Sequence, residues 1–487
     1  MNLAVVLRTT WAVARVLHDR CLGGSLVVVG RDARHRSEDF ALAAAEVLAA
    51  EGFRVMLMPA AVPTPIVAFT VRHTGAVAGI QITASHNPPS DNGYKLYTDG
   101  GLQIVSPTDT DVETAAASAP PADEIARAPV EPNGIEEIQR YVARCGQIRR
   151  APGSVRVALT PLHGVGGDYA LDALVRAGLT DVHVVESQFA PDPDFPTVAF
   201  PNPELPATVE RVLQLAADVD ADIAIALDPD ADRCAVGVPT PEGWRMLSGD
   251  ETGWLLGDYI LNQLEPGPVT EHTVVASTVV SSRMLASIAA AHGARHVETL
   301  TGFKWLTRAD FGLPAGTLVY AYEEAIGHCV DPESVRDKDG ITAAILACDL
   351  VAALRETGRT VLDALDDLAR LHGVHTTTAV TRDVADIGEG AAFMARLRES
   401  QPRQLAGFDI TVEDLSLLRG QKRTDALIMS GGDDATSIRI VTRPSGTEPK
   451  IKSYIEVRHD GGPDVEAARA SAQRVQDDVA AAVRQWS

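Results

Sequence analysis

The sequence lacks any hydrophobic run long enough to cross a membrane, any recognisable secretory leader and any excess of positive charge. No segment approaches the ~18 consecutive apolar residues of a membrane helix, and Arg15, His18 and Asp19 interrupt the apolar residues near the start. The formal net charge is −23, which argues against nucleic acid or an anionic membrane surface as a partner. We therefore expect neither of these partners and no leader.

Cysteines are also few and are scattered along the chain. Their number is odd and their spacing does not match that of a metal site. This pattern predicts buried free thiols in a reducing, cytoplasmic setting. The five are Cys21, Cys145, Cys234, Cys329 and Cys348.

Short β-branched runs alternate with alanine-rich helical stretches along most of the 487 residues. Runs such as Ile223–Leu227 are continuously apolar, which is typical of strands covered on both faces. The sequence therefore predicts three similar α/β domains with mainly parallel, mixed sheets and a C-terminal α+β domain. The expected boundaries are 1–147, 148–264, 265–372 and 373–487.

Ser85 follows the apolar run Ala76–Ile82 and so is expected on a loop at a strand end, where α/β sheets place their ligands. An exposed serine there could be a nucleophile or a carrier of phosphate. His86 and Lys95 are nearby donors. The alternative is an ordinary turn, since Asn-Pro and Asn-Gly pairs form turns.

Three carboxylates follow the predicted strand Ile223–Leu227 at alternate positions: Asp228, Asp230 and Asp232. Such a set converges readily on a hard cation such as Mg²⁺, and Arg233 could offset the charge of an incoming phosphate. A solvated acidic turn is one alternative. A phosphatase with an aspartyl nucleophile is another, although that class usually has threonine or valine where this chain has Asp232.

A third site is split between the predicted loop Thr301–Trp305 and the segment Tyr322–His328. Paired glutamates at a strand end suit sugar hydroxyls, which donate hydrogen bonds to them. Lys338 could be a general acid or base if a cleft lowers its pKa. The charges around Lys338 also fit an ordinary helix N-terminus.

A fourth site, Arg443–Lys450, combines small residues with hydroxyl and guanidinium donors. Arg443, Ser445 and Thr447 together predict a phosphate cradle. A β-turn between strands is the alternative.

Taken in order, the motifs TASHNP, DPDADR, EEAIG and RPSGTEPK resemble those of the α-D-phosphohexomutase superfamily, the phosphoglucomutase/phosphomannomutase group. The resemblance covers nearly the whole chain. It implies four domains around a central cleft and a mutase that interconverts hexose 1-phosphate and hexose 6-phosphate, of mannose or glucose, through a phosphoserine and a 1,6-bisphosphate. Mg²⁺ and, as activator, glucose or mannose 1,6-bisphosphate are the implied cofactors. The implied partner is the hexose phosphate, and we expect a monomer or weak dimer.

The resemblance also implies roles by position. Ser85, His86, Lys95 and Lys338 would be catalytic, and Ser85 would bind the metal together with Asp228, Asp230 and Asp232. The implied substrate-binding residues are Arg233, Gly302, Lys304, Glu323, Ala325, Arg443, Ser445, Gly446, Thr447 and Lys452.

Two departures from the family pattern affect these expectations. Many members carry serine at the position of Ala325, so one contact to the sugar is lost. Members also begin with a glycine-rich segment of the form GTAGLRG, which is missing before Leu3; we expect that the natural start lies upstream or that the chain is truncated. The alternatives are a phosphopentomutase, a metal-dependent sugar phosphatase and a non-catalytic sugar-phosphate binder.

Overall fold

A computed structural model describes residues 1–264, 272–445 and 449–486 of the protein. The chain forms two compact units, each built from two stretches of sequence. The first unit contains Met1–Ile260 and Asp310–Arg359, and the second contains Leu261–Ala309 and Thr360–Ser487. Among the described residues, no helix has the length and apolar character that a membrane crossing requires. The four domain boundaries expected from the sequence stay predictions.

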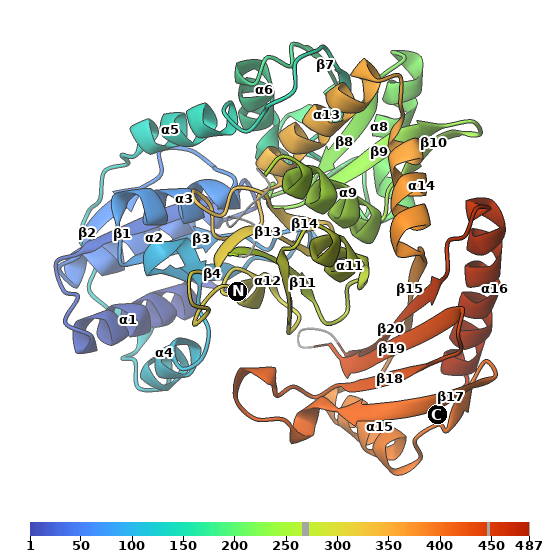
Figure 1. Ribbon diagram of the computed structural model, residues 1–487. Coiled ribbons are helices and arrows are strands. Elements are labelled where there is room, and N and C mark those ends of the chain that lie inside the picture. The colour runs from blue at the N-terminus through green and yellow to red at the C-terminus, as the bar shows by residue number, and fades with distance from the viewer. Residues whose placement is uncertain (265–271, 446–448, 487) are drawn as a thin grey trace. The chain divides into compact units, whose positions relative to one another are not determined.

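The first unit begins with a five-stranded mixed sheet in the order β2-β1-β3-β4-β5. β1 pairs in parallel with β2 and β3, and β4 and β5 add an antiparallel edge. Every residue of β3 is buried, as expected for a strand with helices on both faces. Figure 1 shows these strands with α1, α2 and α3 packed around them. The elements are α1 (Leu3–Asp19), β1 (Leu26–Arg31), α2 (Ser37–Ala50), β2 (Arg54–Leu57), α3 (Thr64–Thr74), β3 (Ala78–Ile82), β4 (Tyr94–Thr98), β5 (Leu102–Gln103), α4 (Thr108–Ala117) and α5 (Ile135–Cys145).

A second five-stranded sheet in the same unit has the order β10-β9-β8-β6-β7. β6 pairs in parallel with β7 and β8, whereas β9 and β10 are antiparallel. The strand predicted at Ile223–Leu227 is confirmed at both ends and is wholly buried. The elements are β6 (Arg156–Thr160), α6 (Gly166–Arg176), β7 (Asp181–Val184), α7 (Glu186–Phe189), α8 (Pro206–Asp218), β8 (Ile223–Leu227), β9 (Cys234–Thr240), β10 (Gly243–Met246) and α9 (Gly249–Asn262).

A hairpin and a buried helix complete the first unit. β13 (Thr317–Glu323) pairs antiparallel with β14 (Gly327–Cys329). Helix α13 (Gly340–Glu356) is capped by Asp339, whose carboxylate accepts hydrogen bonds from the N–H groups of Ile341 and Thr342. Because almost all of α13 is buried, it is a core element of this unit and not a surface helix.

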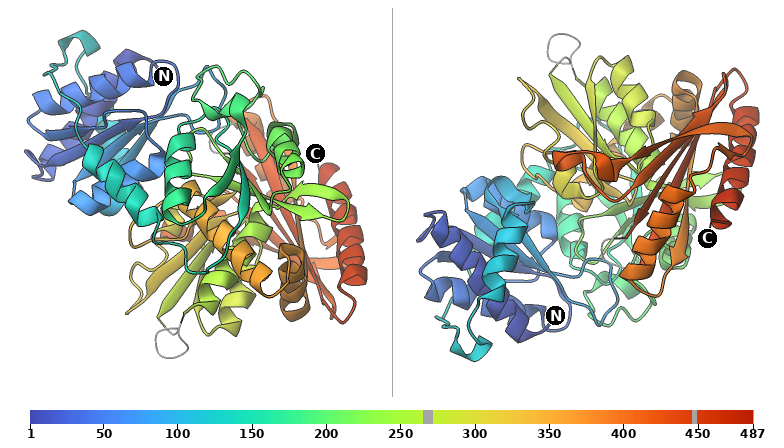
Figure 2. Two further views of the ribbon diagram at one scale, coloured as in Figure 1. Left: turned by 90° about the horizontal axis from the view of Figure 1, so that it is seen from above. Right: turned by 90° about the horizontal axis from the view of Figure 1, so that it is seen from below.

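The second unit contains a parallel strand pair and a six-stranded antiparallel sheet. β11 pairs in parallel with β12, and the larger sheet has the order β15-β20-β19-β18-β17-β16. In Figure 2 the last helix, α16 (red), lies along this sheet, with which it shares a core. The prediction of mixed α/β sheets followed by an α+β part is confirmed. The elements are β11 (Thr273–Thr278), α11 (Met284–Ala291), β12 (Arg295–Thr299), α12 (Phe303–Leu306), α14 (Val361–His372), β15 (Val374–Asp383), α15 (Ile387–Glu399), β16 (Gln404–Leu405), β17 (Phe408–Asp414), β18 (Leu427–Gly432), β19 (Thr436–Pro444), β20 (Lys450–His459) and α16 (Val465–Arg484).

The cysteines form no disulfide, and four of them are buried as predicted. Cys21 is exposed instead. It lies in the turn after α1 and has a positive φ of 60°. The number and spacing of the cysteines do not reveal which of them lies in an exposed turn.

A buried carboxylate links three segments of the second unit. Glu456 in β20 accepts hydrogen bonds from Ser282 Oγ at 2.7 Å and from Arg283 N and Nε at 2.7 and 2.6 Å, and it contacts His375 Nδ1 at 2.8 Å. Burial alone would raise the pKa of Glu456, but His375 and Arg283 hold the pKa well below its ordinary value. The carboxylate is therefore charged and fully used by its neighbours.

We expect Glu456→Gln to lower the free energy of unfolding of this unit by about 3 kcal/mol at neutral pH, since it removes one partner of a buried ion pair. Amides of β15 and β20 should then exchange hydrogen roughly 100-fold faster. Because the pKa of Glu456 is lower in the folded state, its ionisation stabilises the folded unit at pH values above the unfolded-state pKa of about 4.3. This contribution is lost as the pH falls. The difference between variant and wild type should therefore shrink in acid. Hydrogen-exchange mass spectrometry measures both effects. The matched control is Glu413→Gln on the exposed face of β17.

Candidate active site

Ser85 lies on the loop that connects β3 to β4. Its backbone is left-handed, with a φ of 50°, a conformation that is uncommon for residues other than glycine. The N–H of Ser85 donates to Thr83 Oγ1 at 2.9 Å, and Ser85 Oγ donates to Asp228 Oδ2 at 2.9 Å. The strained backbone of Ser85 thus directs its hydroxyl toward Asp228, which follows strand β8 of the second sheet.

The three aspartates that follow β8 converge as the sequence predicted. Asp228, Asp230 and Asp232 are fully buried, and one oxygen from each lies within 4.8 Å of the others. Oδ1 of Asp230 and Oδ1 of Asp232 have no hydrogen-bond partner among the described residues. Buried carboxylate oxygens without donors fit a hard cation. These residues could hold a metal ion.

Cations and hydroxyls of other segments reach the remaining carboxylate oxygens. Lys95 Nζ on β4 donates to Asp230 Oδ2 at 2.6 Å and to Asp232 Oδ2 at 2.7 Å. Thr64 Oγ1 donates to the same Asp230 oxygen at 2.6 Å. Lys338 Nζ lies 3.3 Å from Asp232 Oδ2. The structure therefore brings Ser85, the aspartates and both predicted lysines together.

The charges of this cluster shift its pKa values in opposite directions. Burial, Asp230 and Asp232 raise the pKa of Asp228 well above its ordinary value. Burial would lower the pKa of Lys95, but Asp230 and Asp232 raise it above its usual range. Burial and the crowding of carboxylates therefore oppose the ionisation of Asp228, and a bound cation would relieve this repulsion.

The pKa of Lys338 decides between two roles for this residue. A role as base would require a lowered pKa. Burial acts in that direction, but Asp232 and Asp337 outweigh it and raise the pKa. Lys338 is therefore a cation here, suited to donate a proton or to attract phosphate.

Two glycines allow other backbone segments to approach the metal loop closely. A Cβ on Gly164 would lie 2.4 Å from Cα of Pro229, and one on Gly340 would lie 2.5 Å from O of Arg233. Either would collide with backbone atoms that cannot yield without moving the aspartates. The turn before α6 and the first turn of α13 therefore pack directly against the loop that carries the three aspartates.

The predicted sugar-binding segment lies beside the same loop. Glu323 ends β13 and is 7% exposed, and Ala325 is half-buried in the turn that follows. Burial raises the pKa of Glu323, while Lys338 and Arg233 oppose this change. Arg233 Nη1 also lies 3.5 Å from Glu204 Oε2. An acceptor and a cation are therefore available next to the carboxylates.

His86 follows Ser85 directly, and its Nδ1 lies 3.4 Å from Ser85 Oγ. Burial and the charge of Arg233 lower the pKa of His86 to about 3. Its ring packs edge-on against Phe200, with centroids 6.3 Å apart. His86 is therefore neutral at physiological pH.

The predicted phosphate-binding residues belong to the second unit. Arg443 on β19 and Lys452 on β20 are directly opposite in the antiparallel register. Like charges at such positions repel each other, and an anion bound between them would remove that cost. Ser445 donates its N–H to Lys450 O at 2.8 Å. Gly446 and Thr447 lie outside the described residues.

The remaining predicted substrate residues, Gly302 and Lys304, also lie in the second unit. The predicted loop over Thr301–Trp305 is wrong in part, because Phe303–Leu306 form the one-turn helix α12. Gly302 precedes this turn with a φ of 112°, which only glycine adopts without strain. Lys304 Nζ lies 5.7 Å from the centre of the Trp305 ring.

Sequence reasoning missed two residues that contact the site. Thr64 at the start of α3 bonds Asp230, and nothing in the Pro-Thr-Pro segment around it signals this contact. Arg34 bonds the backbone of the Ser85 loop. The segment Gly30–Arg34, which overlaps the end of β1, resembles the family pattern in its sequence, but that resemblance assigns Arg34 no role.

The sequence matches three family models in succession. They are described as phosphoglucomutase/phosphomannomutase alpha/beta/alpha domain I, II and III, and they match residues 1–122, 136–242 and 248–371.

Curated relatives cover most of the chain. "Probable phosphomannomutase" of Haemophilus influenzae is 37% identical over an alignment of 444 residues that covers 89% of this chain and 88% of the relative. "Phosphopentomutase" of Mus musculus is 33% identical over an alignment of 503 residues, gaps included, that covers 94% of this chain and 81% of the relative. A solved phosphoglucomutase/phosphomannomutase family protein from Burkholderia thailandensis has a TM-score of 0.73 and 20% identity, and the match covers 99% of this chain and 94% of that one. This last likeness is one of fold.

Proposed function

Because the chain belongs to the phosphoglucomutase/phosphomannomutase family and is a phosphomutase, we propose that it interconverts hexose 1-phosphate and hexose 6-phosphate, of mannose, glucose or both, through a phosphoserine at Ser85. One observation carries the proposal: Ser85 Oγ lies 2.9 Å from Asp228 Oδ2 in a buried carboxylate cluster. A hydroxyl in that position can carry a phosphoryl group whose charge a cation offsets.

In the first half of the reaction, the bond between phosphorus and Ser85 Oγ breaks while phosphorus bonds to the free hydroxyl oxygen of the hexose phosphate. That hydroxyl loses its proton, and Ser85 Oγ finally gains one. The product is a hexose 1,6-bisphosphate. The bisphosphate then reorients in the site. Its other phosphoryl group is transferred to Ser85, and the isomeric monophosphate leaves. The same bisphosphate can phosphorylate resting Ser85, so it is the expected activator.

Asp228, Asp230 and Asp232 would hold Mg²⁺. When bound, the cation offsets the negative charge of the phosphoryl oxygens. Asp230 and Asp232 each have one oxygen that accepts no hydrogen bond from the residues described, so both oxygens could bind the cation. When Ser85 is phosphorylated, an oxygen of the phosphoserine would be a further ligand of the cation.

The basic residues divide between proton transfer and charge. Lys95 and Lys338 both retain their protons, so they can protonate the departing Ser85 oxygen or attract phosphate, whereas neutral His86 is suited to accept a hydrogen bond. Glu323 would accept hydrogen bonds from sugar hydroxyls. We assign the phosphate that is not transferred to Arg443, Ser445, Gly446, Thr447 and Lys452, and sugar orientation to Lys304. Arg233 would offset the charge of an incoming phosphate, and Gly302 and Ala325 are assigned to substrate binding.

A pentose phosphate is the second candidate substrate. Relatives named "Phosphopentomutase" of Mus musculus and "Probable phosphoribomutase" of Schizosaccharomyces pombe are 33% and 32% identical to this chain. Ala325 supplies no hydroxyl to the sugar, so the chain itself offers little discrimination between hexose and pentose at this position.

A parallel assay tests these substrates. Glucose 1-phosphate, mannose 1-phosphate and ribose 1-phosphate are each supplied with Mg²⁺ and a trace of glucose 1,6-bisphosphate, and the isomeric phosphate and free phosphate are measured. We expect isomer formation from at least one hexose phosphate and almost no free phosphate. Conversion of ribose 1-phosphate alone would replace the hexose assignment, and no isomer from any sugar would contradict mutase activity.

A further inference from the structure

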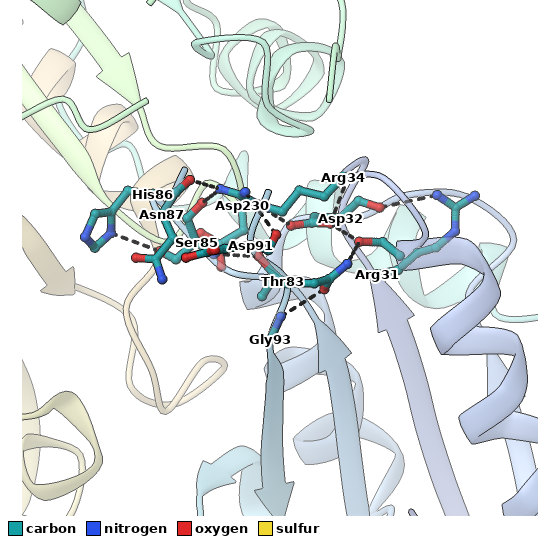
Figure 3. Close-up of polar contacts among 12 residues, drawn as sticks. Arg31, Asp32, Arg34, Thr83, Ser85, His86, Asn87, Asp91, Gly93 and Asp230 are labelled. Carbon is teal, nitrogen blue, oxygen red and sulfur yellow. Dashed lines mark hydrogen bonds and ion pairs between the residues drawn. The ribbon is translucent and has the colours of Figure 1, made fainter. Parts of the chain in front are cut away.

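Arg34 is an arginine buried behind the Ser85 loop. Its side chain is 1% exposed, although it carries a charge and five N–H donors. It lies after β1, and Figure 3 shows it between Asp32 and the loop that contains Ser85 and Asn87. A charge so deeply buried needs partners that hold it there.

The partners are main-chain carbonyl groups of one loop. Nη2 of Arg34 donates to Ser85 O and to Asn87 O, both at 2.6 Å. Nη1 donates to Pro88 O at 2.7 Å and to Asp91 O at 3.3 Å. A single guanidinium thus gathers four carbonyl oxygens from the seven residues that begin at Ser85.

Arg34 is itself fixed in place. Its Nε lies 3.3 Å from Asp32 Oδ2, and the other oxygen of Asp32 accepts hydrogen bonds from Arg34 N at 3.0 Å and Ser37 Oγ at 2.5 Å. The guanidinium carbon also lies 5.0 Å from the centre of the Phe195 ring, within range of a cation–π contact. The group that holds the loop is therefore rigid.

We propose that Arg34 is a positioning residue that fixes the Ser85 loop for phosphoryl transfer. The inference rests on the proposed function. Ser85 needs a left-handed φ of 50°, which costs about 1–2 kcal/mol, and its own carbonyl is one of the four that Arg34 binds. The planar guanidinium can serve oxygens on two sides at once, which the compact ammonium of lysine cannot.

The expected effect of Arg34→Lys follows from this geometry. Loss of carbonyl contacts should let the loop leave the productive geometry, and a displacement of about 1 Å can cost roughly 100-fold in rate. We expect kcat to fall by about that factor. KM should change by less than about threefold, because Arg34 is not one of the residues assigned to substrate binding. Affinity for Mn²⁺ should stay near that of the wild type, since the three aspartates are unchanged.

The experiment compares wild type with Arg34→Lys and Arg34→Ala. Arg36→Lys is the matched control, because Arg36 is exposed and bonds Asp39 on α2. The measurements are kcat and KM, the rate at which glucose 1,6-bisphosphate phosphorylates Ser85, followed by intact mass, Mn²⁺ affinity by calorimetry, and hydrogen exchange of residues 84–93. The Arg34 variants should lose protection in that segment and phosphorylate slowly, and added guanidinium ion should partly restore Arg34→Ala.

Each outcome bears on a separate claim. Wild-type kcat and loop protection in Arg34→Lys would overturn the positioning role. So would loss of protection throughout β1, β2 and β3, because Arg34 would then support the fold in general. An inactive wild type with every sugar phosphate would instead overturn the proposed function.

Discussion

Replacing Ser85 with alanine is expected to reduce mutase activity at least about 10⁴-fold, because the group that carries the phosphoryl between the two halves of the reaction is removed. The free energy of unfolding should change little, since Ser85 is only half-buried. Among the described residues, the one short hydrogen bond of its side chain is that to Asp228. Isomer formation from hexose 1-phosphate measures the effect, and intact mass after exposure to glucose 1,6-bisphosphate should show that the variant gains no phosphoryl group.

Ser90→Ala is the matched control for this change. Ser90 lies on the same loop but is exposed, and its hydroxyl contacts only the neighbouring Asp91 at 3.4 Å among the bonds described. A phosphatase with an aspartyl nucleophile would respond differently to Ser85→Ala. If metal-dependent release of phosphate from the sugar survives in that variant while no isomer forms even from wild type, the aspartate loop is the nucleophile and the mutase assignment is wrong.

Asp230→Asn is expected to lower kcat/KM by about 10³-fold, since a cation that stabilises charge in phosphoryl transfer contributes several kcal/mol. The variant loses a carboxylate whose Oδ1 is buried and has no hydrogen-bond partner in the described part of the chain, and whose Oδ2 accepts hydrogen bonds from Lys95 and Thr64. The Mg²⁺ concentration for half-maximal activity should rise. Saturating Mg²⁺ should raise the melting temperature of wild type, by mass action, and raise that of the variant much less.

Asp218→Asn, at the exposed C-terminal end of α8, removes the same formal charge away from the site. It should keep both the Mg²⁺ dependence and the thermal shift of wild type. If Asp230→Asn showed a wild-type thermal shift with Mg²⁺, the cation would not be bound by this cluster.

The sequence predicted the fold best where apolar runs end abruptly. β8 matches its predicted bounds because Asp228 directly follows its last buried residue. β4 was not predicted, since Tyr94–Thr98 mixes half-buried and buried positions and follows a loop rich in turn formers. Strand pairing depends on hydrogen bonds to distant segments, which local periodicity does not contain.

The site could be predicted in so far as its residues occur in compact motifs. Ser85 and the three aspartates lie in two such segments, and the structure brings them together. Thr64 and Arg34 contact these segments only through folding, across 166 and 51 positions. The raised pKa of Lys338 depends on Asp232, 106 residues earlier in the chain. Electrostatic shifts of this kind require the three-dimensional neighbours and cannot be read from spacing.

The two compact units are interleaved along the chain, and this has a consequence for biosynthesis. The chain leaves the first unit after Ile260 and re-enters it at Asp310. Lys338 therefore leaves the ribosome roughly 5–20 s after Asp232 at ordinary translation rates. Until then the nascent aspartate loop lacks the ammonium of Lys338 and the buried helix α13. A gene divided at the end of Ile260 would therefore not encode a self-sufficient half of the protein, and chaperones that bind unfinished domains are expected to engage this chain late in its synthesis.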